Sequence, residues 1–422
     1  MIFFTSILSN YLPRALILAD SVLRIQPKAH FRVYIYDYDS IPQDSLDGLP
    51  LRIPQLNLVG LEFHPSTACL PYPDLFEGRY GIVEACTAVK PFIALSMLQR
   101  GEECVYLDPD TYIYSSLFPS SSSRLPGDWD LQLTPHVLAP SVSSPLSERL
   151  FFAYGIFNLG YFAVKPTEHA IRFIDWWCSI VDPYGVNVPS AGLFVDQKPL
   201  DFAPTFVERL DIVRHPGWNV AWWNLFSDGR RLLNAHRVEF DGEVMPLVFF
   251  HFSNLDADPV EPFVSRPLRA LHFANKQQLF LASDPEMLAL YGSYLNLLTD
   301  VGALVAGSGV CLSVPRSRRS GLFTRLGLLV NSEIYRLSSL VYSDPSRADG
   351  ICRSAKAKAL PLRLIVLLRL FASSGLPLRR HLAASLMSFV TILFSPTLFE
   401  FSHAASRARS LPPSARSANQ RL

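Results

Sequence analysis

The sequence has few cysteines for its length, and their spacing is uninformative for metal binding. Six cysteines are spread over 422 residues, at positions 69, 86, 104, 178, 311 and 352, and no two of them form a Cys-x-x-Cys pair. This distribution excludes a disulfide scaffold and disfavours a structural zinc module. No basic segment or small-residue cleavage site accompanies the apolar residues after Met1. We therefore expect a protein of the reducing cytoplasm.

Long hydrophobic runs and the signature motifs of several enzyme classes are also missing. No stretch of 18 or more uncharged apolar residues occurs, so the sequence does not predict a membrane-spanning helix. The chain has no Gly-x-Gly-x-x-Gly, no P-loop, no His-Glu-x-x-His and no Gly-x-Ser-x-Gly. Dinucleotide oxidoreductases, P-loop nucleotidases, zinc proteases and α/β-type serine hydrolases are therefore disfavoured.

The chain does have enough apolar residues for a large core, and its charge is unevenly distributed. Hydrophobic residues make up 49% of the sequence and charged residues 18%, which excludes global disorder. Residues 1–314 carry 21 basic and 33 acidic side chains, whereas residues 315–422 carry 17 basic and four acidic ones. An acidic body is thus followed by a strongly basic tail, which favours contact of the tail with a polyanion.

Hydrophobic patterning in the first half of the chain predicts an α/β fold. Short apolar runs alternate with helical stretches, and turn residues separate them. We expect strands at residues 2–6, 31–36, 104–107, 157–164 and 246–252, and helices at residues 12–24, 87–99 and 168–181. The Pro- and Ser-rich residues 115–126 and 135–145 are expected to form loops.

Two aspartates that follow one of these strands are the strongest local signal for chemistry. Asp108 and Asp110 come directly after residues 104–107, and side chains at i and i+2 project from the same side of an extended segment. Two carboxylates at a strand end suit Mg²⁺ or Mn²⁺ bound together with phosphate oxygens. An acidic turn that caps the following segment is the alternative, and the spacing alone leaves both open.

Further motifs surround these aspartates in a characteristic order. They are residues 80–92 (YGIVEACTAVKPF), 155–161 (GIFNLGY), 195–200 (VDQKPL), 217–224 (GWNVAWWN) and 251–253 (HFS). Together with the two aspartates they resemble the GT-A nucleotide-sugar glycosyltransferases, nearest to the retaining branch similar to glycosyltransferase family 8. The resemblance covers about residues 1–275. It implies a GT-A domain, which is a Rossmann-like α/β fold with a mixed central sheet.

The resemblance also implies a metal centre. In that family the Asp-x-Asp carboxylates bind a divalent metal and the sugar nucleotide, which corresponds to Asp108 and Asp110, and a late histidine corresponds to His251. The implied metal is Mn²⁺ or Mg²⁺, and an imidazole among oxygen ligands favours Mn²⁺. The family's usual Gly and Lys-Pro-Trp after this histidine are absent here. An interior histidine at a strand end is therefore the alternative for His251.

Donor-binding and catalytic residues follow from the same resemblance. Asp196 and Gln197 match the family's catalytic Asp-Gln pair, in which the aspartate holds donor-sugar hydroxyls and the glutamine lies near the anomeric carbon. The implied donor is a nucleoside-diphosphate sugar, with UDP-sugars favoured. The residues that would bind it are Thr5, Ser6, Asn10, Tyr11, Lys90, Asp108, Asn158 and Gly160.

Ordinary structural roles are the alternatives for several of these residues. Glu84 can pair with Lys90 in a solvated ion pair, and Ser9 or Asn10 can cap the helix that follows. A glycine in a core strand, such as Gly160, commonly marks a bulge. The six tryptophans all lie between positions 129 and 223, and although aromatic rings stack on sugars, most of them are expected in the core.

The basic tail is expected to contact an anionic membrane surface. We divide the chain into a GT-A domain at residues 1–310, a helical, basic and apolar region at residues 311–403, and a disordered end at residues 404–422. Arginines interleave with Leu- and Phe-rich stretches in the middle region, a pattern typical of interfacial helices. A small helical domain packed on the body is the alternative. Nucleic acid is not an expected partner, because stacking aromatics are lacking.

The sequence thus predicts a metal-dependent glycosyltransferase that is peripheral on the cytoplasmic face of a membrane. Its acceptor would be a glycolipid or a polysaccharide precursor, and retention of the anomeric configuration is implied by the resemblance. A sugar-nucleotide pyrophosphorylase is one alternative, but residues 6–12 lack the Gly-rich basic loop that it needs. A non-catalytic carbohydrate-binding or scaffold protein is another, and the intact aspartates and Gln197 argue against it. The sequence does not indicate an oligomeric state.

Deletion of residues 315–422 tests the membrane prediction. We expect the full-length protein to sediment with vesicles that contain phosphatidylserine and the truncated protein to remain in the supernatant. High salt should release part of the full-length protein, because the attraction is partly electrostatic and therefore screened. Neutral phosphatidylcholine vesicles are the control. Full-length protein that ignores the anionic vesicles would refute the expected membrane contact.

Overall fold

The structure is a computed structural model that describes residues 1–71, 80, 82–119, 122–140, 151–189, 192–253, 255, 284–308 and 310. Apart from Tyr80, these residues belong to one compact unit that spans residues 1–73 and 82–317. The tail that the sequence predicts at residues 311–422 lies outside the described residues. The end of the second predicted loop, residues 141–145, also lies outside them.

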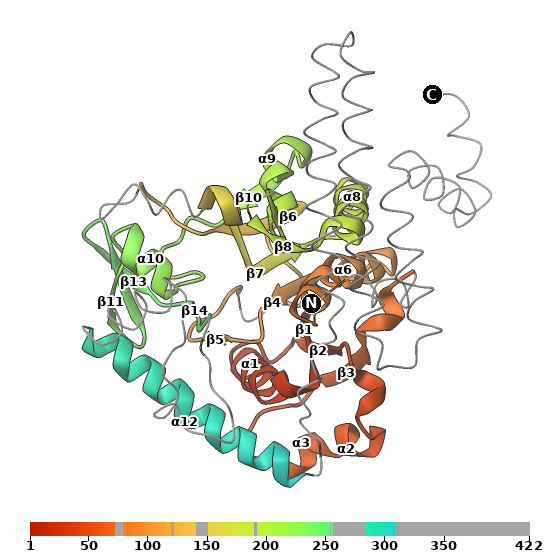
Figure 1. The fold of residues 1–422 in the computed structure, drawn as a ribbon. Helices are drawn as coiled ribbons and strands as arrows, with labels where there is room; N and C mark the ends of the chain where they lie inside the picture. The colour runs from red at the N-terminus through yellow and green to blue at the C-terminus, as the bar shows by residue number, and fades with distance from the viewer. Residues whose placement is uncertain are drawn as a thin grey trace, which may run out of the picture. The chain divides into compact units, whose positions relative to one another are not determined.

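A seven-stranded sheet forms the centre of this unit, in the order β10-β6-β7-β4-β1-β2-β3 (Figure 1). Its strands are β1 (Ile2–Ile7), β2 (His30–Ile35), β3 (Leu61–Pro65), β4 (Cys104–Leu107), β6 (Leu131–Pro135), β7 (Phe157–Val164) and β10 (Leu210–Ile212). Strand β7 runs antiparallel to both of its neighbours, whereas the other neighbouring pairs are parallel. The predicted α/β class with a mixed central sheet is confirmed.

Helices bury both faces of the sheet, which explains why its central strands are continuous apolar runs. The longer helices are α1 (Leu12–Ile25), α6 (Lys90–Gln99), α8 (Glu168–Tyr184) and α12 (Pro285–Gly307). Phe3 on one face of β1 shares an apolar core with residues of α1 and α12. Phe4 on the other face packs on Phe162, which contacts Trp177 of α8. The alternation along β1 therefore serves two separate layers.

Shorter elements connect these layers and extend the sheet edges. The short helices are α2 (Gln43–Asp47), α3 (Leu49–Arg52), α5 (Ile82–Ala88), α9 (Ala203–Phe206) and α10 (Trp222–Ser227), with 3₁₀ turns η1 (Ser9–Tyr11), η2 (Tyr38–Ser40), η3 (Ser66–Cys69) and η5 (Lys198–Phe202). Strand β5 (Thr111–Ile113) pairs with β14 (Phe249–His251), and β8 (Asn187–Val188) pairs with β9 (Leu193–Phe194). Strands β11 (Arg231–Asn234), β12 (Arg237–Phe240) and β13 (Glu243–Pro246) form a separate sheet.

The structure divides two elements that the sequence predicts as continuous. The predicted helix at residues 87–99 is the end of α5 followed by α6, so that Lys90 begins a new helix. The predicted strand at residues 246–252 is the end of β13 followed by β14. Between them the backbone N–H groups of Val248 and Phe249 both donate to the carbonyl of Gly217. This change of partner turns the chain toward β5.

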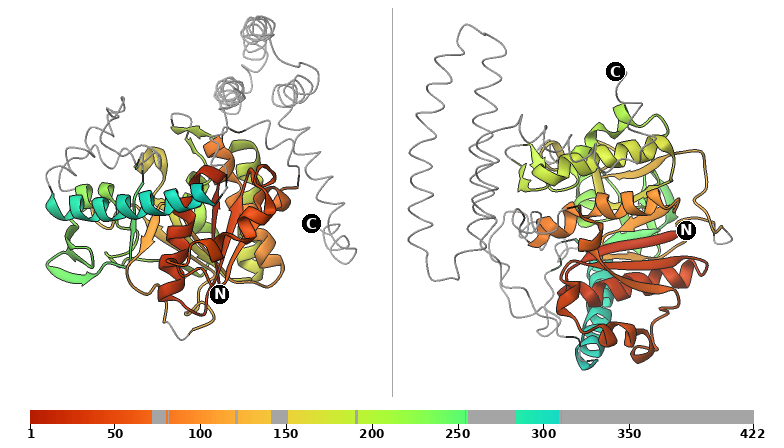
Figure 2. Two further views of the ribbon diagram at one scale, coloured as in Figure 1. Left: turned by 90° about the horizontal axis from the view of Figure 1, so that it is seen from below. Right: turned by 90° about the vertical axis from the view of Figure 1, so that its right-hand side faces the viewer.

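Strand β6 and helix α12 are among the elements that the sequence did not predict. By length and composition α12 could cross a membrane, and here it packs beside α1 with one face buried (Figures 1 and 2). Its buried face includes Met287, Leu298 and Tyr294, and the Tyr294 ring stacks on Phe252 with centroids 3.9 Å apart. Helix α12 therefore covers the apolar residue that directly follows His251.

Replacement of two glycines by alanine tests this packing. A Cβ on Gly217 would lie 1.9 Å from the carbonyl oxygen of Pro246, whereas a Cβ on Gly292 of α12 would meet nothing within 4 Å. We expect Gly217→Ala to lower the melting temperature clearly, because backbone must move. Gly292→Ala should leave it unchanged or raise it, since alanine favours a helix by about 1 kcal/mol over glycine. Thermal unfolding followed by circular dichroism measures both. Equal effects would contradict the close approach at Gly217.

Candidate active site

Asp108, Asp110 and His251 converge although the last two are 141 positions apart in the chain. Antiparallel pairing of β5 with β14 places His251 opposite Thr111, the neighbour of Asp110. The backbone N–H of Phe252 donates to the Asp110 carbonyl oxygen at 2.7 Å and closes the end of this pair. The His251 Nε2 atom lies 3.2 Å from Asp110 Oδ1 and 3.7 Å from Asp108 Oδ2. One ligand atom from each residue lies within 4.8 Å of the others, a spacing that can hold one metal ion.

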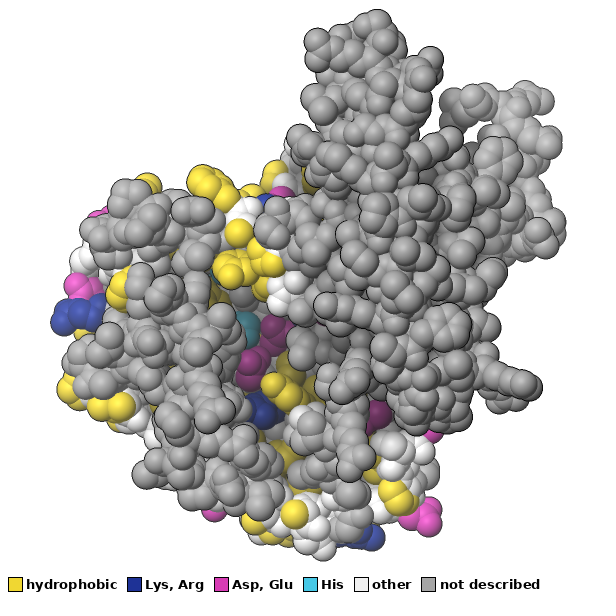
Figure 3. All heavy atoms as spheres, viewed as in Figure 1, with side chains coloured by type: hydrophobic (Ala, Val, Ile, Leu, Met, Phe, Trp, Pro, Cys, Tyr) yellow, Lys and Arg dark blue, Asp and Glu magenta, His cyan; other side chains and the backbone are white. Residues whose placement is uncertain are grey.

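These three side chains combine access with burial. The aspartate side chains are 22% and 20% exposed, and that of His251 is 4% exposed. Figure 3 shows acidic side chains and a histidine gathered in a hollow on the face viewed in Figure 1. Burial alone would lower the pKa of His251, but the carboxylates of Asp110 and Asp108 raise it above its ordinary value. Carboxylates this close to the ring favour a positive charge at His251, which either a proton on the imidazole or a bound metal ion can supply.

Gly160 on β7 provides the space for the His251 ring. A Cβ at this position would lie 2.5 Å from His251 Nδ1 and 2.7 Å from Cε1, so any side chain would displace the imidazole. The Gly160 carbonyl also accepts a hydrogen bond from the Asp108 backbone N–H at 3.0 Å. The pairing of β7 with β4 is regular at the adjacent Tyr161, whereas its pairing with β6 shifts register between Phe157 and Phe162, so the expected bulge is present on that edge. Gly160 therefore accommodates the histidine at this site.

Lys90 joins the aspartates of two separate motifs. Its Nζ atom lies 3.0 Å from Asp108 Oδ1 and 3.2 Å from Asp196 Oδ2, with the Lys90 and Asp196 side chains almost fully buried. The Tyr106 hydroxyl also donates to Asp108 Oδ1, at 2.6 Å. Burial would lower the pKa of Lys90, but the two carboxylates raise it, so the ammonium stays charged. Glu84 is buried as well, so a solvated ion pair between Glu84 and Lys90 does not hold.

Asp196 has an unusual protonation equilibrium. Burial, together with the nearby charge of Asp108, raises its pKa to about 6 in spite of the opposing charge of Lys90. Its backbone carbonyl accepts a hydrogen bond from Trp177 Nε1 at 2.7 Å, which fixes the segment against α8. A buried carboxylate held beside one ammonium can accept hydrogen bonds from a ligand that enters the site.

The end of β1 presents buried polar atoms that have no partner within the described residues. They are Thr5 Oγ1, Ser6 Oγ and Asn10 Oδ1. Because buried polar atoms are normally hydrogen-bonded, each of these atoms is a candidate for contact with a ligand, although Thr5 and Ser6, as neighbours in a strand, project to opposite faces of the sheet. Strand β1 lies next to β4, which leads to Asp108. Thr5 and Ser6 therefore lie near the end of a strand that runs parallel to the one the aspartates follow, and Asn10 comes shortly after it.

The alternative role of Ser9 or Asn10 as a helix cap is wrong. Helix α1 begins at Leu12, Tyr11 occupies the N-cap position, and no side chain caps the helix. Ser9 instead uses its backbone N–H and its hydroxyl to bind the Asp37 carboxylate, at 2.8 Å and 2.5 Å. Tyr11 is 38% exposed, and the Arg14 guanidinium lies over its ring, with the guanidinium carbon 4.7 Å from the centroid.

Gln197 and Asn158 are both buried and both engaged by the protein. The Gln197 Oε1 atom accepts from the Leu159 backbone N–H at 2.9 Å, and its Nε2 donates to the Tyr154 carbonyl at 2.8 Å. Asn158 Oδ1 accepts from the Gly160 backbone N–H, also at 2.9 Å. These bonds tie the 195–200 motif to the start of β7. The predicted contacts of Gln197 and Asn158 with a sugar remain predictions.

Sequence reasoning assigned no role to Tyr106 or Asn219, which also belong to the site. Tyr106 stands two positions before Asp108 on a strand, so the period of two could have placed both on one side. Asn219 lies within a motif that was recognised, but its contact with His251 depends on the fold, since 32 positions separate them. No local sequence pattern predicts the contact between Asn219 and His251.

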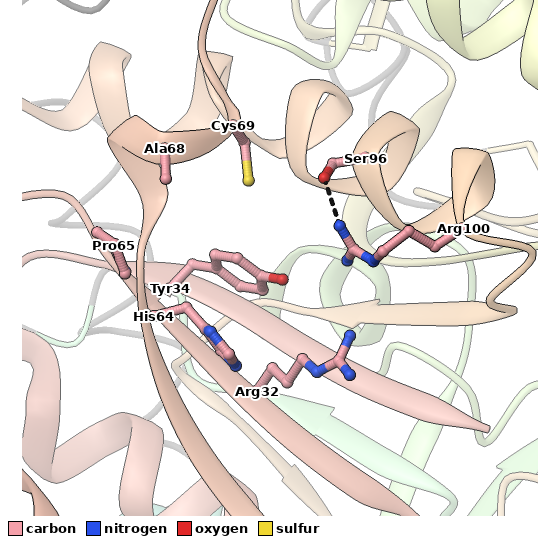
Figure 4. A pocket seen from close by; sticks show the side chains of 8 residues that line it. All are labelled: Arg32, Tyr34, His64, Pro65, Ala68, Cys69, Ser96 and Arg100. Atoms are coloured by element: carbon pink, nitrogen blue, oxygen red, sulfur yellow. Dashed lines mark hydrogen bonds between the residues drawn. The ribbon is translucent and has the colours of Figure 1, made fainter.

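A separate cavity of about 340 Å³ lies between β2, β3, η3 and α6 (Figure 4). Its lining residues are Arg32, Tyr34, His64, Pro65, Ala68, Cys69, Ser96 and Arg100. Both arginines bind the Glu102 carboxylate, at 2.9 Å and 3.0 Å, and Arg32 also binds Glu62. Their charges are therefore already compensated, and the cavity offers no excess positive charge to an anion.

Solved structures of glycosyltransferases resemble the chain. The galactosyltransferase LgtC, in complex with donor and acceptor sugar analogues, is 17% identical, over 67% of this chain and 96% of its own, with a TM-score of 0.39. Mouse xyloside xylosyltransferase 1 is 14% identical, over 60% and 97%, with a TM-score of 0.38. The glycosyltransferase GlyE of Streptococcus pneumoniae TIGR4 is 13% identical, over 72% and 63%, with a TM-score of 0.38.

No protein-family model matches the sequence, and no curated protein matches it.

Gly160→Ala tests the placement of His251. The added methyl group would overlap the imidazole, so the ring must turn away from the two aspartates. We expect the affinity for Mn²⁺, measured by electron paramagnetic resonance of the free ion, to fall by roughly 10- to 100-fold, as when a metal ligand loses its orientation. Gly292→Ala, which meets nothing within 4 Å, is the control. Unchanged Mn²⁺ affinity in a folded Gly160→Ala protein would contradict a metal-ligand role of His251.

Proposed function

We propose that this protein is a metal-dependent glycosyltransferase of GT-A type, which moves a sugar from a nucleoside-diphosphate sugar to an acceptor hydroxyl. The observation that carries the proposal is the convergence of Asp108, Asp110 and His251 beside the unpaired polar atoms at the end of β1. The first group suits a divalent cation with a diphosphate, and the second suits the remainder of a nucleotide. Together they correspond to the motifs that resemble the GT-A glycosyltransferases.

The metal-ligand atoms of Asp108, Asp110 and His251, called the triad from here on, fit Mn²⁺. Two carboxylate oxygens and one imidazole nitrogen are ligands that Mn²⁺ accepts readily, whereas Ca²⁺ and Mg²⁺ prefer oxygen alone. Asp108, Asp110 and His251 would hold the ion. A bound Mn²⁺ supplies a Lewis acid that stabilises the negative charge of the departing diphosphate.

The charge of the site gives an independent reason for a cation. When ionised, Asp108, Asp110 and Asp196 together carry more negative charge than Lys90 can balance, and a diphosphate adds more. Like charges at such short range in a partly buried site repel one another, so the carboxylates would repel the diphosphate of the donor. A divalent cation removes this repulsion, so donor binding should depend on the metal.

The chain's own residues then have distinct roles. Thr5, Ser6 and Asn10 bind the nucleotide through their unpaired oxygens, and Tyr11, which is 38% exposed, stacks on the base. UDP-sugars are the favoured donors. Lys90 holds the Asp108 carboxylate in place and lies within reach of the diphosphate.

The transfer itself involves Asp196 and Gln197. The Asp196 carboxylate accepts hydrogen bonds from donor-sugar hydroxyls, and Gln197 lies on the acceptor side, where the second hydrogen of Nε2 is available beyond its bond to Tyr154. The acceptor hydroxyl oxygen bonds to the anomeric carbon while the bond to the diphosphate oxygen breaks, and the hydroxyl proton passes to that departing oxygen. Attack from the face of the leaving group retains the anomeric configuration.

The acceptor is a glycolipid or a polysaccharide precursor at the cytoplasmic face of a membrane. The support is the sequence of residues 311–403, in which arginines interleave with apolar stretches. Such a segment holds a protein at an anionic surface and brings the site close to a lipid-linked acceptor.

A screen of sugar nucleotides for slow hydrolysis by the purified full-length protein tests the proposal. We expect release of nucleoside diphosphate that stops on chelation and is restored best by Mn²⁺. Asp108→Asn, Asp110→Asn and His251→Ala should each reduce the rate by about 100-fold or more, because each removes a metal ligand. Asp128→Asn, at an exposed carboxylate paired with Arg209, is the matched control.

The outcomes of this screen separate the alternatives. Near-normal hydrolysis by the His251→Ala variant would show that His251 is an interior histidine with no role as a metal ligand. It would also show that the donor site still folds without it. Absence of both hydrolysis and Mn²⁺-dependent nucleotide binding would refute the proposed function. Product NMR of a completed transfer reports the anomeric configuration, and an inverted product would refute retention.

A further inference from the structure

A chain of buried hydrogen bonds leads from His251 into the protein. The His251 Nδ1 atom lies 3.2 Å from Asn219 Oδ1. On the other side of the same amide, Asn219 Nδ2 donates to Asn158 Oδ1 and to Thr134 Oγ1, each at 2.9 Å. Asn219 is 1% exposed. The imidazole is therefore connected to a fixed interior amide on the side opposite the aspartates.

The partners of each amide determine its orientation. Asn158 Oδ1 receives two donors, the Gly160 backbone N–H and Asn219 Nδ2, so this atom must be the carbonyl oxygen. Asn219 Nδ2 faces that oxygen, and a flipped Asn219 would place two carbonyl oxygens against each other. The oxygen of Asn219 must then face His251, since an amide has one oxygen and one nitrogen.

This orientation determines which nitrogen of His251 carries a proton. A carbonyl oxygen can only accept, so the Nδ1 atom that faces it must be an N–H donor. The Nε2 atom on the opposite side of the ring, 3.2 Å from Asp110 Oδ1, is then the one available to a metal ion. In metal sites a second partner of this kind fixes both the tautomer and the orientation of the histidine.

The backbone holds Asn219 in this position. Its φ of 48° lies in the left-handed region, where asparagine and glycine are better tolerated than other residues. The His251 backbone N–H also donates to the carbonyl of Val220, the neighbour of Asn219, at 2.7 Å. The segments that contain Asn219 and His251 are thus hydrogen-bonded at adjacent points, once between side chains and once between backbone groups.

We propose that Asn219 is the positioning residue of the metal centre. It keeps the proton of His251 on Nδ1 and turns Nε2 toward Asp108 and Asp110. The proposal rests on the proposed function in one respect, that the group bound by the triad is a divalent cation. Asn219 acts through His251 and needs no contact with the substrate.

Two variants at position 219 separate this role from a general role in packing. Asn219→Gly suits the left-handed backbone and removes the acceptor, whereas Asn219→Asp also suits it and keeps an oxygen facing His251. With Mn²⁺ alone as the probe, we expect Asn219→Gly to lose roughly 10- to 100-fold in affinity. Asn219→Asp should bind Mn²⁺ within about threefold of the wild type, even though its new contact with Asn158 Oδ1 lowers the melting temperature.

Asn224→Ala is the matched control. It removes another buried amide, which donates to the Asn219 backbone carbonyl but makes no hydrogen bond to His251 in the described part of the structure. We expect it to lower the melting temperature and to leave Mn²⁺ affinity within about threefold of the wild type. Equal loss of affinity in Asn219→Gly and Asn219→Asp, or the same loss in Asn224→Ala, would overturn the proposal.

NMR of ¹⁵N-histidine-labelled protein gives a readout that requires neither metal nor activity. We expect a slowly exchanging Nδ1–H signal from His251 in the wild type, assigned with His251→Ala, and its loss in Asn219→Gly. Absence of that signal in the wild type would overturn the proposal. A protected Nδ1–H together with no Mn²⁺ affinity would refute the metal centre and the proposed function, while the bond between Asn219 and His251 would stand.

Discussion

The antiparallel pairing of β5 with β14 is the contact on which the candidate site depends. It places His251 across from Thr111 and lets Phe252 donate to the carbonyl of Asp110. The pairing is possible because the chain leaves β13 at Pro246 and bonds to Gly217, a position that admits no side chain. It is held from the other side by α12, whose Tyr294 covers Phe252. The convergence of the three candidate ligands is therefore a consequence of core packing.

A second constraint is the balance of charge around Lys90. A buried ammonium is costly unless carboxylates surround it, and here Asp108 and Asp196 do so from two different motifs. Asp108 also faces His251, whose Nε2 atom lies 3.7 Å from Asp108 Oδ2. The burial of Lys90 and the arrangement of the candidate metal ligands thus depend on one set of groups.

The neighbours of these charged groups are neutral and rigid. Hydrogen bonds among Asn158, Asn219 and Thr134 determine the orientation of both amides. The missing side chain of Gly160 provides the space that the imidazole occupies. Neutral amides can orient a histidine without adding to the negative charge of the site. A carboxylate in the place of Asn219 would orient the ring equally well but would add to that charge.

The sequence by itself determined the α/β class, the positions of β1, β4, β7 and α8, and the acidic pair at the end of β4, because these depend on apolar periodicity and on neighbours in the chain. It also named His251, although by resemblance and with an interior histidine left open. Tertiary structure decided what surrounds that histidine. The Gly160 gap, the Asn219 contact and the bridge from Lys90 to Asp196 join residues 32 to 106 positions apart, and no local propensity encodes which distant side chains meet when the sheet and its covering helices pack together.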